Sequence, residues 1–428
     1  EFSYGIDLTS MKINDVDVKY TDLTQGMSAD INGLNMSAKA KVRGENIAGN
    51  VKASLRDIAY QQTTDSLSMA VKLNDLKLEG DADMNGDDIK ADIEVSSSIL
   101  FYENAGQIAE LNSLDFSFKG DVNNYDIIKG NVEMAVGDLS FSMDDELLVN
   151  KADIRAIAPL NATLSTMDVE LGASQLALNN IFVDIIGKVA MPEDDINIDM
   201  NVKTNTIMMD ELIGLIPASM REELLEGIDV KGELKLVADI KGVYNENTMP
   251  VVNAELEYNK GMVSMPEMLP YPITNLNTSI KADLDLNDKS DVYVNHLNAN
   301  MSNSALSFSG TIKDVMDKMY CNLNLKANAD LDELQAFMPE GIVAKGMVKL
   351  NGNAKVNSHQ LTTMDFTQAK VNGSLQWNDM DVLYCDTVNV KADELKLDFS
   401  LPKTGSEQLA NSFINVAISG NNMDAKVS

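Results

Sequence analysis

The side chains best suited to catalysis or metal binding are few in this sequence and lie far apart. The 428 residues include two His and two Cys. His296 and His359 are 63 positions apart, and neither has Cys or carboxylate neighbours at the spacing of a zinc ligand set. Both are interpreted as ordinary strand or surface histidines, and the sequence predicts no metal site.

Acidic pairs and hydroxyl residues are more common, but their patterns match no calcium-binding or catalytic motif. The acidic runs lack the Asp-x-Asp-x-Asp-Gly order of a calcium loop, so we expect solvated turns; they are Asp87-Asp88, Asp144-Asp145-Glu146 and Asp194-Asp195. The Ser and Thr residues form no Gly-x-Ser-x-Gly nucleophile elbow. We therefore expect no catalytic residue, no cofactor and no enzymatic activity.

The two cysteines lie in strand-like surroundings, at Cys321 and Cys385. We interpret them as unpaired thiols that behave as small apolar residues. A disulfide between them stays open as the alternative.

The charge balance excludes several kinds of partner. The chain has 34 Lys and Arg against 66 Asp and Glu, which gives a formal net charge of −32. Nucleic-acid binding needs cations that replace phosphate counterions, and a polybasic membrane patch needs clustered cations. The composition, with 44% hydrophobic residues, is that of a folded protein.

Period-two alternation of apolar and polar residues dominates the chain. In one example, Ile89, Ala91, Ile93 and Val95 alternate with charged residues. Strict alternation is typical of antiparallel strands with one apolar and one polar face. The same pattern recurs at 196–202, 234–240, 280–286, 321–325 and 395–401.

Turn residues punctuate these strands and predict a long series of hairpins. Asn, Asp and Gly tolerate the positive φ that hairpin turns need. We expect turns at Asn50, Asn85-Gly86-Asp87, Asn259-Lys260-Gly261, Asn351-Gly352-Asn353 and Gly420-Asn421-Asn422.

Only two short helices are predicted. The first lies near 208–226, where Pro217 interrupts it and the Ser219-x-x-Glu222 capping box restarts it. The second lies at 331–338 and ends before Pro339.

Two internal repeats suggest the organisation of the chain. Tyr20, Tyr60 and Tyr102 mark units of about forty residues, which we expect to hold three to four strands each. A longer repeat relates Asp210-Glu211-Leu212 to Asp332-Glu333-Leu334 at an offset of 122. We therefore predict a β-repeat region at 1–165 and two long β repeats at 166–289 and 290–428.

The apolar face of such a sheet must be buried against something. It either packs on a second layer of the same protein or curls around an apolar ligand. The face is rich in Leu, Ile, Val, Ala and Met and poor in aromatics, which favours an acyl-chain ligand over a self-filled core. The predicted lipid-binding residues are Leu234, Leu236, Ile240, Leu256, Ile280, Leu284, Leu286, Leu323 and Leu325. A two-layer core built from the same residues stays open.

Several sequence segments resemble those of the AsmA-like family of bacterial envelope proteins. One runs from Lys12 to Asp22, where a strand pattern is followed by Tyr and then Asp, and another is the Pro-rich stretch from Gly261 to Leu276. The helix followed by Lys-Gly after Asp210 and after Asp332 is also similar to that family. The abundance of Asn, Asp, Lys and Met resembles the composition of members from the Bacteroidetes.

The resemblance implies an elongated antiparallel sheet curled into an apolar groove that carries phospholipid or another acyl-chain lipid between the inner and outer membranes. It also implies a periplasmic location, an inner-membrane anchor, a role in envelope integrity and envelope protein partners. Because the chain starts at Glu1 and has no apolar segment of eighteen residues, we expect a fragment or processed form whose anchor lies outside it. The alternative is a structural or adhesive β-repeat or β-sandwich protein with a self-filled core.

Overall fold

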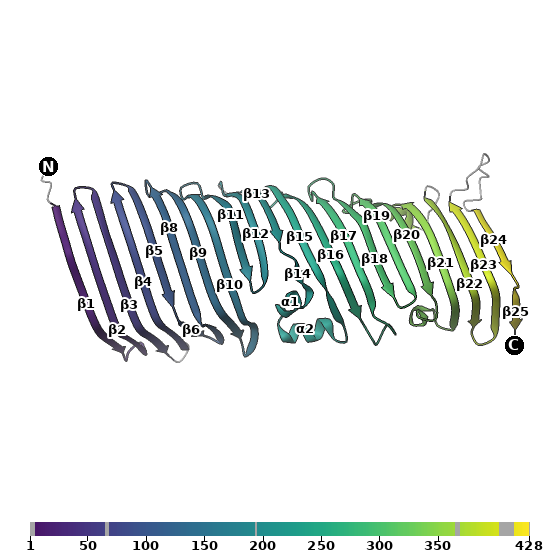
Figure 1. The fold of residues 1–428 in the computed structure, drawn as a ribbon, viewed down its shortest axis with the longest axis horizontal. Coiled ribbons are helices and arrows are strands. Elements are labelled where there is room, and N and C mark those ends of the chain that lie inside the picture. Colours follow the sequence, from purple (N-terminus) through teal and green to yellow (C-terminus); the bar gives the residue numbers. More distant parts are fainter. Residues whose placement is uncertain (1–4, 65–67, 193–194, 364–368, 402–414, 428) are drawn as a thin grey trace. The chain divides into compact units, whose positions relative to one another are not determined.

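The computed structural model describes residues 5–64, 68–192, 195–363, 369–401 and 415–427, most of which lie in β-strands (Figure 1). Within these ranges, backbone hydrogen bonds join 25 strands into one antiparallel sheet. Short helices interrupt the series. The predicted fold class, a mainly β protein of repeated antiparallel strands with a few short helices, is confirmed.

The strands have between 2 and 18 residues, and long and short ones occur in both halves of the chain. The earlier ones are β1 (Gly5–Asp22), β2 (Met27–Arg43), β3 (Asn46–Thr63), β4 (Ser68–Asn85), β5 (Asp88–Ser97), β6 (Ile99–Asn104), β7 (Gln107–Leu111), β8 (Ser113–Asn123), β9 (Ile127–Met143), β10 (Glu146–Thr163), β11 (Asp168–Leu178), β12 (Ile181–Ala190) and β13 (Ile196–Thr204). The later ones are β14 (Ile207–Met208), β15 (Asp229–Tyr244), β16 (Val251–Ser264), β17 (Ile273–Leu284), β18 (Asp291–Met301), β19 (Ser304–Lys313), β20 (Tyr320–Asp330), β21 (Ile342–Val356), β22 (Lys370–Tyr384), β23 (Val388–Leu401), β24 (Asn415–Asn421) and β25 (Asp424–Val427).

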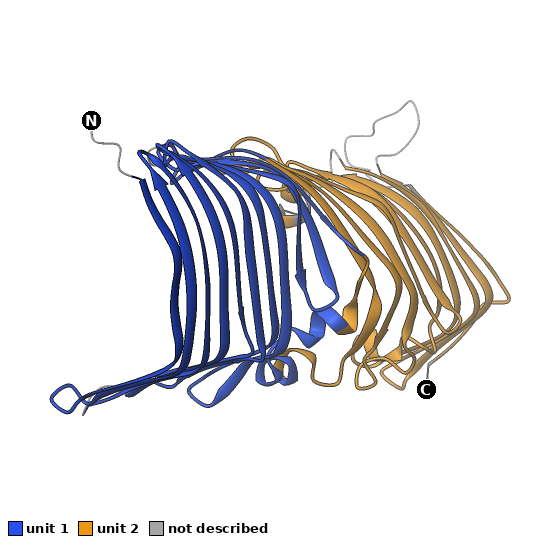
Figure 2. Ribbon diagram, turned by 60° about the vertical axis from the view of Figure 1, so that its left-hand side comes forward, with its two compact units in different colours: residues 1–205, 211–222, 241–247 blue, residues 206–210, 223–240, 248–428 orange. Residues whose placement is uncertain are grey.

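The chain divides into two compact units (Figure 2). Unit 1 comprises residues 1–205, 211–222 and 241–247, and unit 2 comprises 206–210, 223–240 and 248–428. The long strands of unit 1, blue in Figure 2, bend along their length. The predicted repeat boundaries after residues 165 and 289 stay predictions.

The first forty-residue unit is one pair of long strands, so the prediction of three to four strands is wrong for it, whereas the unit from Tyr60 to Tyr102 contains β4, β5 and β6. β1 and β2 have 18 and 17 residues, and one hairpin therefore fills the first unit. The repeat is visible in the register: Tyr20 pairs with Ala29 and Ala29 with Tyr60, and Val71 pairs with both Tyr60 and Tyr102. The three repeated tyrosines thus lie in one row, a series of residues paired across successive strands.

Three of the predicted turns are instead strand interiors. Asn50 lies in β3, Asn259-Lys260-Gly261 in β16 and Asn351-Gly352-Asn353 in β21. In an interior strand, pairing on both sides outweighs the local turn preference of Asn and Gly. The predicted turns at Asn85-Gly86-Asp87 and Gly420-Asn421-Asn422 do fall at strand ends.

The first helical prediction is confirmed and the second is wrong in type. α1 (Met209–Gly214) and α2 (Ala218–Leu225) fill the predicted segment 208–226. Segment 331–338 forms turns and a three-residue 3-10 helix, η1 (Gln335–Phe337). The Gln335 side-chain amide donates to the carbonyls of Leu331, at 2.8 Å, and of Ala344, and so holds the segment against β21. α3 (Ser358–Thr363) is an unpredicted helix.

A carboxylate anchors each of the two predicted helical segments, 208–226 and 331–338, to a hairpin turn. Glu211 Oε1 accepts a hydrogen bond of 3.0 Å from Nδ2 of Asn180, between β11 and β12. Glu333 accepts one from the backbone N–H of Asn303, at 2.9 Å, and one from the hydroxyl of Ser304, at 2.7 Å, between β18 and β19. Glu211 and Glu333 are 122 residues apart, so the long sequence repeat places equivalent anchors at equivalent turns.

Glu333→Gln is expected to lower the free energy of unfolding of unit 2 at pH 7 by about 1–2 kcal/mol. The neutral amide oxygen accepts the hydrogen bonds from Asn303 and Ser304 more weakly than the carboxylate does. Burial opposes the charged form of Glu333, but the hydrogen bonds from Asn303 and Ser304 outweigh it and hold the pKa below its usual 4.5. A lowered folded-state pKa stabilises the protein above the unfolded-state pKa, and this stabilisation is lost as the pH falls through the folded-state pKa. Urea unfolding measured at pH 7 and at successively lower pH should therefore show the gap between the variant and the unaltered chain narrowing as the pH falls below 4.5.

Glu340→Gln is the matched control, because Glu340 is an exposed carboxylate at the end of the same segment. It should leave the urea midpoint unchanged at each of these pH values. A gap between Glu333→Gln and the unaltered chain that stayed constant with pH would contradict the role of the carboxylate charge.

A line of β-bulges crosses the strands of unit 1 and accounts for their bend. Asp15, Asp138 and Lys151 lie inside strands with φ between 48 and 52°, and each coincides with a shift in strand register. The extra residue at each shift bends and twists its strand locally. Asp75 has the same conformation, but β3 and β4 pair past it without a shift. Asp tolerates the conformation better than most residues other than glycine.

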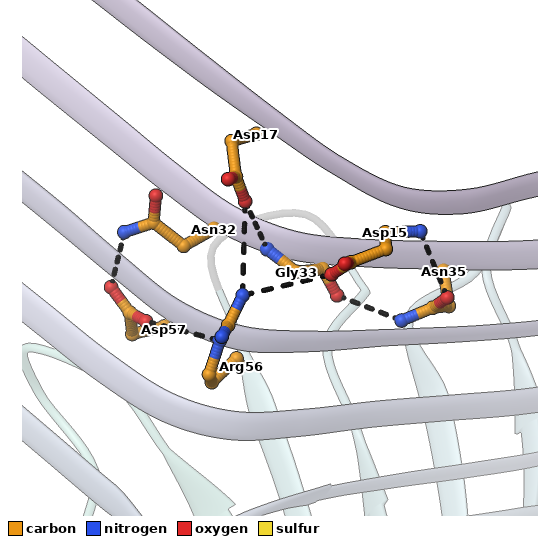
Figure 3. Close-up of polar contacts among 7 residues, drawn as sticks. All are labelled: Asp15, Asp17, Asn32, Gly33, Asn35, Arg56 and Asp57. Atoms are coloured by element: carbon orange, nitrogen blue, oxygen red, sulfur yellow. Dashed lines mark hydrogen bonds and ion pairs between the residues drawn. The ribbon is translucent and has the colours of Figure 1, made fainter.

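Side chains of neighbouring strands bind the backbone groups at these bulges (Figure 3). The Asp15 N–H donates to Asn35 Oδ1 at 3.0 Å, and the Gly33 N–H donates to Asp17 Oδ1 at 2.8 Å. Arg56 Nη2 lies 3.7 Å from Asp15 and 3.8 Å from Asp17, distances at which exposed ion pairs contribute little. The hydrogen bonds to backbone therefore fix the bend.

Neither unit has a dry core among the residues that the structure describes. Only twelve apolar side chains there are buried, and seven of these are alanines. The accessible surface is 26712 Å², whereas two separate compact bodies of half the mass would expose about 19,000 Å². A self-filled two-layer core, the alternative suggested by the sequence, lacks the buried side chains that it requires.

Candidate functional site

The apolar face of unit 2 contains most of the side chains predicted to bind lipid. Strand pairing links Leu256 to Ile280, Ile280 to Val294, Val294 to Gly310 and Gly310 to Leu323. The predicted residues Leu256, Ile280 and Leu323 thus lie in one row across five strands, which we call the Leu256 row. All five members of the row are half-buried, and no described strand forms a second layer over them.

Neighbouring rows contain further predicted residues. Leu325 pairs with Phe308, next to the Leu256 row, and Leu284 pairs with Val252 on the same face of β16 and β17. The three predicted residues of β15 are also half-buried; they are Leu234, Leu236 and Ile240.

Leu286 is the one predicted residue that the structure separates from this face. It follows the end of β17 and is 51% exposed. The Asn287 N–H donates to Asp285 Oδ1 at 3.0 Å, so the alternating pattern continues into a turn rather than along the strand.

Unit 1 has a comparable apolar face, although none of its residues is among those predicted to bind lipid. A row of small residues crosses six strands from β2 to β9, and we call it the small-residue lane: Ala40, Gly49, Ala82, Ala91, Gly120 and Gly130. Larger apolar residues predominate in the rows beside it. One row is Val42, Ile47, Met84, Ile89, Val122 and Ile128, and the other is Ala38, Val51, Gly80, Ile93, Phe118 and Val132.

The dimensions of the small-residue lane suit an extended hydrocarbon chain. Six strands at ~4.8 Å spacing span about 24 Å, and each flanking row lies about 7 Å along the strands. The alternation at 89–95 was the sequence signal for this face. It could not reveal the lane, because a row depends on the register of six strands.

The opposite face of the sheet carries charges that pair across strands. Lys52 Nζ lies 2.5 Å from Glu79 Oε2, and Lys119 Nζ lies 2.5 Å from Asp92 Oδ2. The carboxylate hydrogen bond raises the pKa of each lysine. Because these pairs are exposed they add little stability, and the face is solvated.

The two cysteines are free, as the sequence predicted. Cys321 pairs with Val356 at one end of β21, and Cys385 donates its backbone N–H to the Gly341 carbonyl beside the other end. A 15-residue strand lies between them, so they are far beyond the Cα separation of about 7 Å that a disulfide allows. Burial raises the pKa of the Cys321 thiol, which makes it less reactive.

The described part of the chain has no cluster of three or more His, Cys, Asp or Glu side chains that could hold a metal ion. His296 lies on β18 and His359 on α3. The helices in the described ranges have at most eight residues, and none is long and apolar enough to cross a membrane.

Comparisons of the chain with protein-family models, curated proteins and solved structures found no match. The resemblance to the AsmA-like family therefore stays a prediction from the sequence.

Proposed function

We propose that this chain is a non-enzymatic lipid-binding protein of the bacterial periplasm that transfers phospholipid between the inner and outer membranes and so contributes to envelope integrity. The observation that carries the proposal is the apolar face that, in the described part of each unit, has no second layer over it. An inner-membrane anchor outside this chain and envelope protein partners belong to the same proposal, and both derive from the AsmA-like resemblance.

The energetics of hydrocarbon in water support this proposal. At about 0.8 kcal/mol for each buried CH₂, a chain of roughly sixteen methylenes costs on the order of 13 kcal/mol to hold in water. A carrier must therefore keep the chain against apolar side chains throughout. The Leu256 row in unit 2 and the small-residue lane in unit 1 each offer such contact over several consecutive strands, while a charged head group stays in solvent.

Native mass spectrometry tests the proposal directly. The chain, purified from bacterial membranes and periplasm without detergent, should carry adducts that lipid extraction identifies as phospholipid. A lipid-free spectrum, together with no uptake of phospholipid from vesicles, would overturn the proposal.

A further inference from the structure

The polar face of unit 2 contains a region without carboxylates, in a chain whose net charge is −32. It consists of positions 305, 307, 309 and 311 of β19 and the positions paired with them on β20, β21 and β22. These four rows of four residues hold six Asn, one Gln, four Ser or Thr, four Lys and one Ala. We call this region the amide–lysine patch.

Two lysines of the amide–lysine patch face each other across neighbouring strands. Lys355 lies directly opposite Lys370, and like charges facing each other across antiparallel strands are unfavourable. Lys326 lies two strands and two rows away from Lys370, and Lys349 lies six positions along β21 from Lys355, at the other end of the patch. None of the four forms an ion pair with any described residue, which is also true of Lys90 and Lys129 on the polar face of unit 1, so the facing pair is what sets the patch apart. A ligand with negative groups would remove this repulsion.

A hollow of about 540 Å³ lies within the amide–lysine patch. Its lining includes Lys326 and Asn353, and no carboxylate contributes to it. The hollow of about 430 Å³ on unit 1 is different, because its lining includes Glu79, Glu94 and Asp115. The hollow in the patch is therefore distinguished by the charge of its lining.

We propose that the amide–lysine patch binds an acidic glycan, a polyhydroxylated chain that carries carboxylate or phosphate groups. Amide and hydroxyl side chains both donate and accept hydrogen bonds, as sugar hydroxyls require. Lysine ammonium groups neutralise the anionic substituents. Because strand side chains alternate between faces, the patch lies on the face opposite Leu323 and Leu325, and the proposal does not depend on lipid binding.

The composition of the patch argues against two other polyanionic partners. Its sixteen positions include no aromatic side chain, whereas single-stranded nucleic acids are held largely by stacking on aromatics. They also include no large apolar side chain that could insert into an anionic bilayer.

The test uses polygalacturonate as the probe, with neutral dextran for comparison, in isothermal titration calorimetry of the whole chain. The unaltered chain should bind polygalacturonate, more weakly as salt is raised, and should not bind dextran. The triple variant Lys326→Gln, Lys355→Gln, Lys370→Gln should bind polygalacturonate at least tenfold more weakly. Since all three side chains are exposed, we expect its circular dichroism to match that of the unaltered chain.

The matched control removes three positive charges at paired lysines, as Lys52→Gln, Lys119→Gln, Lys241→Gln. It should keep the affinity of the unaltered chain for polygalacturonate. An equal loss of affinity for polygalacturonate in the two triple variants would show that only the net charge of the chain matters, and would overturn the proposal. Binding of phosphatidylglycerol vesicles or of single-stranded DNA without binding of polygalacturonate would also overturn it, as would no binding at all.

Discussion

Replacing Leu256 and Ile280 together with aspartate is expected to lower the phospholipid bound to unit 2 at least tenfold. The two side chains pair across β16 and β17 on the apolar face. Each would lose a hydrocarbon contact worth about 1.5–3 kcal/mol when complete, and a tenfold change needs only about 1.4 kcal/mol. Two carboxylates must also stay hydrated, so an acyl chain cannot lie over them.

Photo-crosslinking confines the measurement to this part of unit 2. A p-benzoylphenylalanine at the position of Leu323 shares the row of Leu256 and Ile280, and should crosslink to bound phospholipid. The control variant Asn253→Asp, Asn259→Asp adds the same two charges to β16 at exposed positions of the polar face. Equal crosslinking in the aspartate variant and this control would rule out the apolar face as the lipid-binding surface.

Alternation in the sequence was enough to predict the faces of the strands but not the rows that cross them. Leu256 and Ile280 could be assigned to an apolar face because apolar residues alternate with polar ones, including Glu and Lys, around both of them. Leu323 joins their row through two intermediate pairing partners: Ile280 pairs with Val294, Val294 with Gly310, and Gly310 with Leu323. Register between strands is a property of pairing, and a single strand does not encode it.

A bulge underlies one of the three wrong turn predictions, whereas Asn50 and Asn351-Gly352-Asn353 lie where the strands pair without a register shift. A residue with positive φ inside a strand is drawn from the same residue types as a hairpin turn, so Asn259-Lys260-Gly261 was interpreted as a turn. In the structure, Lys260 has a φ of 53° within β16, and its N–H donates to Asn277 Oδ1 at 2.9 Å. Only the neighbouring strand, which supplies that acceptor, distinguishes the bulge from a turn.

The amide–lysine patch could not be predicted from the net charge of the chain. A surplus of acidic residues predicts an acidic surface everywhere, and Lys355 and Lys370 are separated in sequence by 15 positions that include α3. The pairing of β21 with β22 places them opposite each other. Local charge depends on which strands are adjacent, which the sequence composition does not reveal.

Gly120→Ala is expected to lower the free energy of unfolding of unit 1 by about 3 kcal/mol, the upper end of the usual cost of overpacking. Gly120 pairs with Gly130 in the small-residue lane. A Cβ at Gly120 would overlap the carbonyl oxygen of Lys129 and lie 2.7 Å from the Cα of Gly130. Both contacts are with backbone, so β8 and β9 would have to separate. Urea unfolding followed by circular dichroism measures the loss.

Gly80→Ala is the matched control, because Gly80 lies in the row beside the lane on β4. Its Cβ would meet only Cγ1 of Val51, at 3.4 Å, which is an ordinary contact distance. Alanine restricts the unfolded chain more than glycine does, so Gly80→Ala should leave stability unchanged or raise it by up to about 1 kcal/mol. If Gly120→Ala were as stable as Gly80→Ala, the close approach of β8 and β9 would not be what requires glycine in the lane, and contact with a ligand would be the remaining physical reason for its small residues.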